Sequence, residues 1–179
     1  MTHRATAKFR RRTVEFWSGD SFCSAWLYLP DTASEDRLPV VVMGHGLGAT
    51  REMGLAPYAE RFAAAGLAVL VFTHRHLGDS GGQPRQVLAV AKQLADWDAA
   101  LEYAARLPEI DGNRVAAWGS SMGGGHAIAV AARHPELRAA VAQCPFTDGP
   151  ASAGALGVRE SLALFGFVAR DLMAMVRGK

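Results

Sequence analysis

The sequence predicts an α/β fold: a mostly parallel β-sheet with helices on both faces, preceded by an amino-terminal antiparallel hairpin. Two observations carry this prediction. Beyond the hairpin, strand-like segments alternate with helix-like segments, and the strand-like segments are short, continuous apolar runs. Such runs are typical of strands buried on both faces of a parallel sheet. Regular β-α-β alternation implies right-handed crossovers, which carry helices across the faces of the sheet.

The expected elements follow in chain order. Residues 8–17 alternate polar and apolar side chains, Ser18-Gly19-Asp20 makes a turn, and residues 22–29 continue extended, so a hairpin is expected. Further strands are expected at 39–44, 67–72, 114–118 and 137–143, with a turn over 108–113. Helices are expected from Pro57 to Gly66, over 86–107 and over 121–134. In the first two helices apolar residues recur at helical spacing, which gives each a face that packs on the sheet.

Composition restricts the class of protein. The 179 residues are 50% hydrophobic and carry a formal net charge of +2, which is typical of one globular domain and excludes disorder. The basic residues at 4–12 form a terminal cluster, so we expect no nucleic-acid partner. The longest apolar run, 62–72, is far shorter than the roughly 20 residues of a membrane span, and no signal core is visible. We therefore expect a cytoplasmic protein without a membrane partner.

The cysteines and histidines give no metal-binding pattern. Cys23 and Cys144 lie in apolar, strand-like contexts, and both are expected to be buried, reduced thiols. No cluster of His, Cys or Asp has the spacing of metal ligands. The sequence therefore implies no metal and no cofactor.

A Gly-x-Ser-x-Gly turn is the most informative motif. A strand runs into Gly119-Ser120-Ser121-Met122-Gly123 and then into a helix. A nucleophile on such a sharp turn needs small residues two positions to either side, because side chains there would collide with the adjacent backbone. The two glycines meet that need around Ser121, whereas a motif centred on Ser120 would place Trp118 and Met122 there. Ser121 is therefore the candidate nucleophile, and the backbone N–H of Met122 is a candidate oxyanion donor.

A second glycine-rich turn follows the apolar run at 39–43. Its sequence, Gly44-His45-Gly46-Leu47-Gly48, allows backbone amides to approach a ligand at the carboxyl end of a neighbouring strand. The backbone N–H of Leu47 is the candidate second donor of an oxyanion hole.

Together these turns resemble those of the α/β-hydrolase superfamily. The motifs that carry the resemblance, in the family's order, are His45-Gly46-Leu47-Gly48, Arg75 to Gly82, and Gly119 to Gly124. The match covers about residues 10–150 and is most similar to bacterial dienelactone-hydrolase-like and acylpeptidase-like esterases. The resemblance implies Ser121 as nucleophile, and Leu47 and Met122 as the oxyanion hole.

The superfamily places an acid and then a histidine after the nucleophile, beside the last strands of an eight-stranded sheet. Six strands are expected here, so the chain resembles a carboxy-terminally truncated member that lacks the last strands. Residues 1–150 would form the α/β-hydrolase core. Residues 151–179 would form a helical segment, either packed on the core or the start of a cap. Asp148 follows the sixth strand and is the candidate acid.

The general base stays open. His126 lies five residues along the helix from Ser121, a rise of about 7.5 Å and a rotation of about 140°, which excludes direct contact. His45 belongs to the oxyanion turn, where the resemblance implies a structural role. His74 and His76 follow a neighbouring strand and are candidates either for the base or for turn packing.

These observations lead us to expect a serine hydrolase that cleaves a carboxylic ester or related acyl group of a small molecule through a Ser121 acyl-enzyme. Turnover is expected to be impaired, because a serine nucleophile needs a positioned general base and no histidine of the sequence is assigned to that role. Two alternatives stay open: a non-catalytic or truncated binding protein of this fold, and an acyltransferase or perhydrolase, since a fold does not fix a substrate. The sixth strand would leave an open apolar edge, so self-association is expected.

Overall fold

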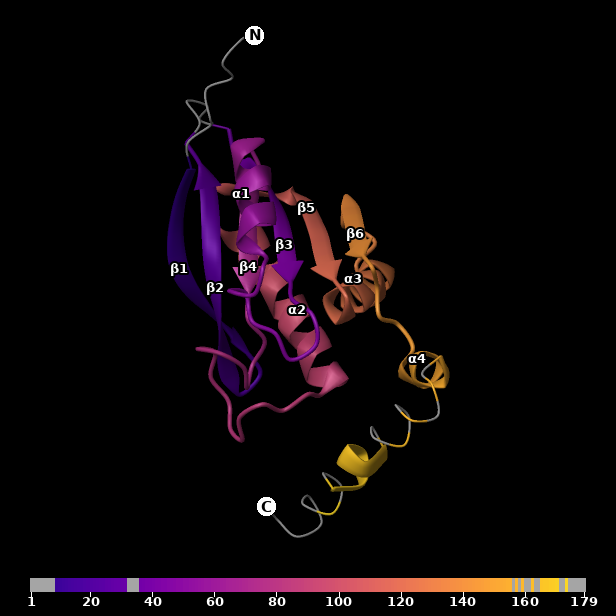
Figure 1. The fold of residues 1–179 in the computed structure, drawn as a ribbon. Coiled ribbons are helices and arrows are strands. Elements are labelled where there is room, and N and C mark those ends of the chain that lie inside the picture. Colours follow the sequence, from indigo (N-terminus) through magenta and orange to yellow (C-terminus); the bar gives the residue numbers. More distant parts are fainter. Residues whose placement is uncertain are drawn as a thin grey trace. The chain divides into compact units, whose positions relative to one another are not determined.

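The computed structural model describes residues 9–31 and 36–155, together with residues 157, 159, 162, 165–170 and 173. Its strands are β1 (Phe9–Ser18), β2 (Ser21–Pro30), β3 (Leu38–Gly44), β4 (Ala68–Phe72), β5 (Ile110–Ser120) and β6 (Ala139–Gln143). Its helices are α1 (Ala56–Ala64), α2 (Val90–Arg106), α3 (Met122–Arg133) and α4 (Gly149–Gly154) (Figure 1). Each strand and helix expected from the sequence up to residue 143 is present, with shifted ends.

The six strands form one sheet in the order β1-β2-β4-β3-β5-β6. Strands β1 and β2 form the expected antiparallel hairpin, and β2 also pairs antiparallel with β4. The other pairs, β3 with β4, β3 with β5 and β5 with β6, are parallel. The predicted fold class is therefore confirmed. Parallel pairing brings the carboxyl ends of β3 and β5 side by side, with Gly44 opposite Gly119.

One boundary was wrong. Residues 110–113 were expected in a turn, but β5 begins at Ile110, which pairs with Leu38 ahead of a register shift. Asp-Gly-Asn at 111–113 is typical of a turn, and the pairing partner that overrides this preference is more than seventy residues away in the chain.

Helices cover both faces of the sheet, as expected. On one face α2 and α3 bury residues such as Trp97, Ala100 and Ala127 against inward-facing residues of the strands. On the other face α1 packs Ala59 and Ala63 on a smaller apolar cluster. Strands β3 and β4 have helices on both sides, which explains their unbroken apolar sequences.

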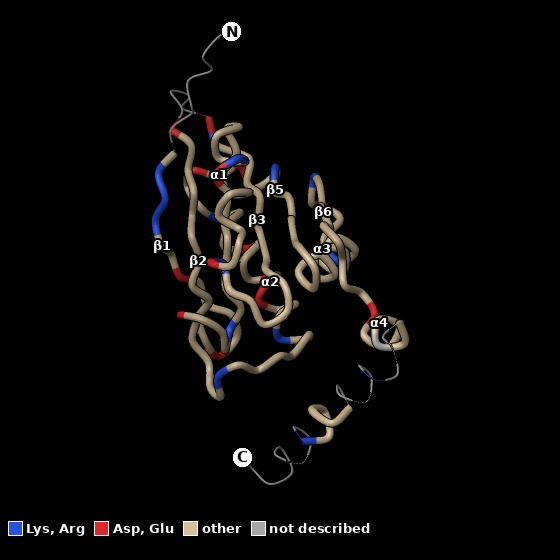
Figure 2. The backbone as a smooth tube through the Cα atoms, viewed as in Figure 1, with Lys and Arg blue, Asp and Glu red and all other residues tan. Residues whose placement is uncertain are grey.

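The two edges of the sheet differ in charge. The edge strand β1 carries Arg10, Arg11, Arg12 and Glu15, whereas β6 carries no charged residue (Figure 2). Residues Ala139 to Val141 of β6 are exposed. Charges on an edge strand discourage pairing with another chain. Because β6 lacks such charges, it is the edge better suited to pairing with another chain. Self-association through β6 stays a prediction.

The chain divides into two compact units, Met1–Phe146 and Thr147–Lys179. In the second unit, Asp148 caps α4, because its carboxylate accepts the Ala151 N–H at 2.9 Å. Leu162, Phe165 and Val168, of the apolar face expected in this segment, are exposed. Leu172 and Val176, also assigned to that face, lie outside the described residues. No helix within the described residues is long and apolar enough to cross a membrane.

Candidate functional site

Ser121 lies at the junction of β5 and α3 in a strained backbone conformation. Its φ and ψ angles are 55° and −121°. A positive φ is uncommon for a residue with a Cβ, and such a conformation costs of order 1–3 kcal/mol. It persists only where the surrounding structure holds it, and such residues cluster at functional sites.

Three glycines allow the backbone to close around Ser121. A Cβ on Gly119 would overlap the carbonyl group of Gly123. A Cβ on Gly123 would lie 2.5 Å from the carbonyl oxygens of Gly44 and His45. A Cβ on Gly46 would lie 3.3 Å from the Ser121 Cβ. The structure thus has the crowded turn that the glycine spacing indicated, and it brings the turn after β3 against Ser121.

Two backbone amides beside Ser121 are free to bind a ligand. Within the described part of the chain, the N–H groups of Leu47 and Met122 donate no hydrogen bond to another residue. The Met122 N–H is at the first residue of α3, where helical amides lack an internal partner. The Ser121 side chain does not cap α3 either. The site therefore offers a free hydroxyl and two free donors at the carboxyl ends of β3 and β5.

His45 holds the turn after β3. Its Nδ1 donates to the Gly46 carbonyl at 2.9 Å, and its Nε2 accepts the His74 N–H at 3.2 Å, so the ring is neutral. Burial, reinforced by neighbouring His74, lowers the pKa of His45 to about 3. The Gly46 carbonyl and the Leu47 N–H belong to one planar trans peptide group and point in opposite directions. The hydrogen bond from His45 therefore sets the direction of the Leu47 N–H.

A buried carboxylate, Asp96 of α2, supports His74 in turn. It is 1% exposed and accepts hydrogen bonds from His74 Nδ1 at 3.1 Å and from the N–H and Nε of Arg75 at 3.1 and 2.5 Å. Arg75 also contacts Asp20 and the Lys92 carbonyl. A continuous chain of polar contacts thus leads from α2 through His74 and His45 to the turn beside Ser121.

No described histidine is hydrogen-bonded to Ser121. His74 is committed to Asp96, and His76 Nδ1 donates to the Pro84 carbonyl at 2.8 Å. His126 Nδ1 donates to the Met122 carbonyl, one turn earlier in α3, at 2.7 Å. His134 pairs with two surface carboxylates, and His3 lies outside the described residues. Neither His74 nor His76 makes the contact that a general base would need.

Stability is expected to fall as the pH decreases from about 6.5 to about 4. Burial is the main cause that lowers the pKa values of both His45 and His126, so the folded chain keeps these rings neutral. The unfolded chain therefore binds protons that the folded chain does not, and His45 alone removes about 1.4 kcal/mol per pH unit from the free energy of unfolding in this range. His126 changes the stability in the same direction. Urea unfolding followed by tryptophan fluorescence between pH 7 and pH 4 would measure the loss, and a constant midpoint would contradict it. His126→Asn should reduce the slope.

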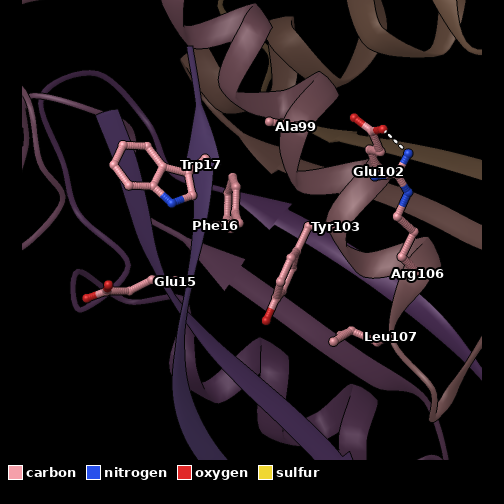
Figure 3. A pocket seen from close by; sticks show the side chains of 8 residues that line it. All are labelled: Glu15, Phe16, Trp17, Ala99, Glu102, Tyr103, Arg106 and Leu107. Carbon is pink, nitrogen blue, oxygen red and sulfur yellow. Dashed lines mark ion pairs between the residues drawn. The ribbon is translucent and has the colours of Figure 1, made fainter. Parts of the chain in front are cut away.

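A surface cavity of about 340 Å³ between β1 and α2 belongs to a different part of the molecule. Phe16 stacks on Tyr103 with 5.4 Å between the ring centroids, and Trp17 and a Glu102–Arg106 ion pair lie beside them (Figure 3). None of the residues that line the cavity belongs to the turns around Ser121. The described residues also contain no group of three His, Cys, Asp or Glu side chains that could hold a metal ion.

Comparison with known proteins identifies the family. The family model of the X-Pro dipeptidyl-peptidases (S15 family) matches residues 23–175. The chain belongs to the S15 family. The match includes the turn after β3, Ser121 and the turn after β6, so the S15 family assignment rests on the part of the chain that carries the site.

Individual proteins and a solved structure are also similar to the chain. The chain is 50% identical over 165 residues to the quorum-quenching protein AidA of Acinetobacter baumannii, covering 92% of this chain and 54% of that protein. It is 33% identical over 138 residues to a thiohydrolase of Eupenicillium brefeldianum, covering 76% of this chain and 44% of the relative. The α/β-hydrolase GrgF of Penicillium sp. sh18 superposes with a TM-score of 0.75 at 24% identity, covering 95% of this chain and 56% of GrgF.

These comparisons confirm the resemblance to α/β-hydrolases. The chain spans about half the length of the curated relatives it matches. The relatives include hydrolases, and the S15 chain has the fold of that class.

The sequence did not reveal two features of the site. The Asp96–His74 contact joins residues on α2 and after β4, and nothing in the local pattern around Asp96 indicates it. The prediction that both cysteines are buried was wrong for Cys144, which is exposed and has a positive φ of 43° in the turn after β6, whereas Cys23 is buried. Cys144 directly follows the apolar run of the sixth expected strand, which hid this turn.

Proposed function

We propose that this protein is a serine hydrolase that cleaves a carboxylic ester or related acyl group of a small molecule through an acyl-enzyme on Ser121. The observation that carries the proposal is the strained Ser121 beside the two free amides of Leu47 and Met122. Attack on an acyl carbonyl places negative charge on its oxygen, and each positioned donor of an oxyanion hole lowers the barrier by about 3 kcal/mol. The two amides would form that hole.

The substrate class includes thioesters in this proposal. A thiohydrolase is among the relatives, and an acyl thioester gives the same tetrahedral intermediate as an ester. Asp148 stays a candidate for the acid, although its carboxylate is engaged as the cap of α4. The general base is not assigned to any of the described histidines.

Labelling with a fluorophosphonate probe tests the proposal. The wild-type chain should form one covalent adduct, located at Ser121 by peptide mass analysis, and Ser121→Ala should form none. Ser120→Ala is the matched control, because this half-buried neighbour ends β5 and has no role in the proposal. It should be labelled like the wild type. A folded wild-type protein that shows no Ser121-dependent adduct would exclude the proposed nucleophile.

A non-catalytic protein that binds acyl compounds is the second candidate. It is favoured by the lack of a hydrogen bond between Ser121 and any described histidine. Hydrolysis of a p-nitrophenyl ester discriminates between the two functions. Turnover that Ser121→Ala abolishes and Ser120→Ala preserves would argue against the binding protein.

A further inference from the structure

The turn after β6 holds both backbone polar groups of Ser121. Gln143, the last residue of β6, pairs with Ser120, and its carbonyl accepts the Ser121 N–H at 2.9 Å. Three residues later, the Phe146 N–H donates to the Ser121 carbonyl at 2.9 Å. The segment Gln143–Phe146 therefore closes a backbone clamp around Ser121, from a strand that is distant from it in the chain.

We propose that Phe146 is a positioning residue of the oxyanion hole and acts through its backbone N–H. The Ser121 carbonyl and the Met122 N–H belong to one planar trans peptide group, so they point in opposite directions. A donor that holds the carbonyl on one side therefore aims the Met122 N–H to the other side, where the oxyanion would form. This inference rests on the proposed function, because it assigns the Met122 amide to that oxyanion.

The Ser121 carbonyl accepts a second hydrogen bond, which belongs to α3 and not to the turn after β6. Its donor is the Gly125 N–H at 3.1 Å, which makes the ordinary hydrogen bond of the first turn of α3. That bond forms whenever α3 forms. It does not by itself fix the φ angle of Ser121, the residue before the helix. Ser121 donates one bond of the clamp to the Gln143 carbonyl and accepts the other from the Phe146 N–H. These two bonds fix Ser121 in a conformation that it would not hold by itself, at φ 55° and ψ −121°.

The geometry of the turn indicates that its backbone carries the role. Cys144 reverses the chain with a φ of 43°, and both Cys144 and Phe146 expose their side chains. On the other side Gly124 allows the turn to approach α3, since a Cβ there would lie 3.1 Å from the Gln143 oxygen and 3.2 Å from the Pro145 Cα. The side chain of Phe146 thus adds little to the core, while its N–H reaches Ser121.

Phe146→Pro and Phe146→Ala separate the backbone from the side chain. Proline removes the N–H, whereas alanine retains it and removes the ring. We would measure the maximal rate of inactivation and the inhibitor constant for a fluorophosphonate at Ser121. Phe146→Pro should lower the maximal rate about 10- to 100-fold and leave the inhibitor constant within about twofold, since a misaimed donor loses part of one oxyanion bond. Phe146→Ala keeps the N–H and should lose far less of the maximal rate than Phe146→Pro. If the Phe146 N–H only stabilised the fold, its removal would not lower the maximal rate of inactivation while leaving the inhibitor constant unchanged.

Folding of the proline variant is checked by its urea unfolding midpoint. If it does not fold, an ester bond in place of the amide between Pro145 and Phe146 removes the same N–H and keeps the side chain, and the same loss of rate is expected. Equal rates for the wild type and the variant without the N–H would overturn the proposal. An equal loss in Phe146→Ala would also overturn it.

Amide hydrogen exchange separates a failure of this inference from a failure of the proposed function. If wild-type Ser121 is not labelled, the proposed nucleophile fails. Slow exchange at Phe146, despite its exposed side chain, and fast exchange at Met122 would then still support the clamp and the free amide. Fast exchange at Phe146 would overturn the clamp in either case.

Discussion

Gly119→Ala is expected to lower the free energy of unfolding by about 3–5 kcal/mol, more than the 1–3 kcal/mol typical of an overpacked side chain. The added Cβ would overlap the Gly123 carbonyl group and lie 2.7 Å from the Gly124 N, which are backbone atoms of the first turn of α3. No rotamer change relieves such an overlap, so α3 or β5 must shift. Chemical denaturation followed by circular dichroism would measure the loss.

The shift is costly because the turn after β3 packs equally closely against the other side of the first turn of α3. Gly123 itself lies against the carbonyls of Gly44 and His45, so movement of α3 away from Gly119 presses on the turn after β3. Gly54→Ala is the comparison for backbone strain without a steric clash: Gly54 has a φ of 85° and open space around it, so the change costs about 1–2 kcal/mol, whereas Gly119 has no positive φ and its cost is steric. If Gly119→Ala were no more destabilising than Gly54→Ala, steric closure of the turn Gly119–Gly123 around Ser121, here called the elbow, would be contradicted.

The elbow was predictable from sequence because its requirement is local. A glycine two positions before and two positions after Ser121 is what a strand entering a helix through a sharp turn needs, and both conditions are visible within five residues. The hairpin of β1 and β2 was predictable for the same reason, since alternation and a Gly-Asp turn are local signals.

The supports of the elbow were not predictable, because they come from distant segments. His45 and His74 were noted as residues of two separate turns, but the contacts of His74 with His45 and with Asp96 depend on the parallel pairing of β3 and β4 and on where α2 crosses the sheet. The clamp from Phe146 likewise depends on the pairing of β6 with β5. Sequence pattern indicates which segments are strands, whereas their order determines which turns meet.

Asp96→Ala is expected to lower the free energy of unfolding by about 3–5 kcal/mol, the range for removing one partner of a buried ion pair. Without the Asp96 carboxylate, the Arg75 guanidinium, which is 6% exposed, has no buried partner of opposite charge, and His74 Nδ1 has no acceptor. Asp98→Asn on the same helix is the control, because this carboxylate is 39% exposed and its pairs should contribute less than about 1 kcal/mol. Equal effects of the two changes, measured by urea unfolding, would contradict the prediction.

The pKa of Asp96 gives the pH dependence of this contribution. Burial acts to raise that pKa, but the hydrogen bond and charge of His74, with the charge of Arg75, outweigh burial and lower it. The folded chain therefore prefers the carboxylate, so the stabilisation is present above the ordinary pKa of an aspartate and is lost as the pH falls through the lowered value. The difference in stability between the wild type and Asp96→Asn should accordingly narrow in acid.

Removing both charges together tests whether the network stabilises the fold or mainly fixes its geometry. Much of the cost of Asp96→Ala comes from stranding Arg75, so Asp96→Leu combined with Arg75→Met should be less destabilising than Asp96→Leu alone. The double variant still lacks the acceptor for His74, whose backbone N–H holds His45 Nε2. We therefore expect the double variant to be more stable than Asp96→Leu alone, while its Ser121 is labelled more slowly than that of the wild type. Apolar side chains can replace the packing of a buried ion pair, but they cannot direct a hydrogen bond as the ion pair does.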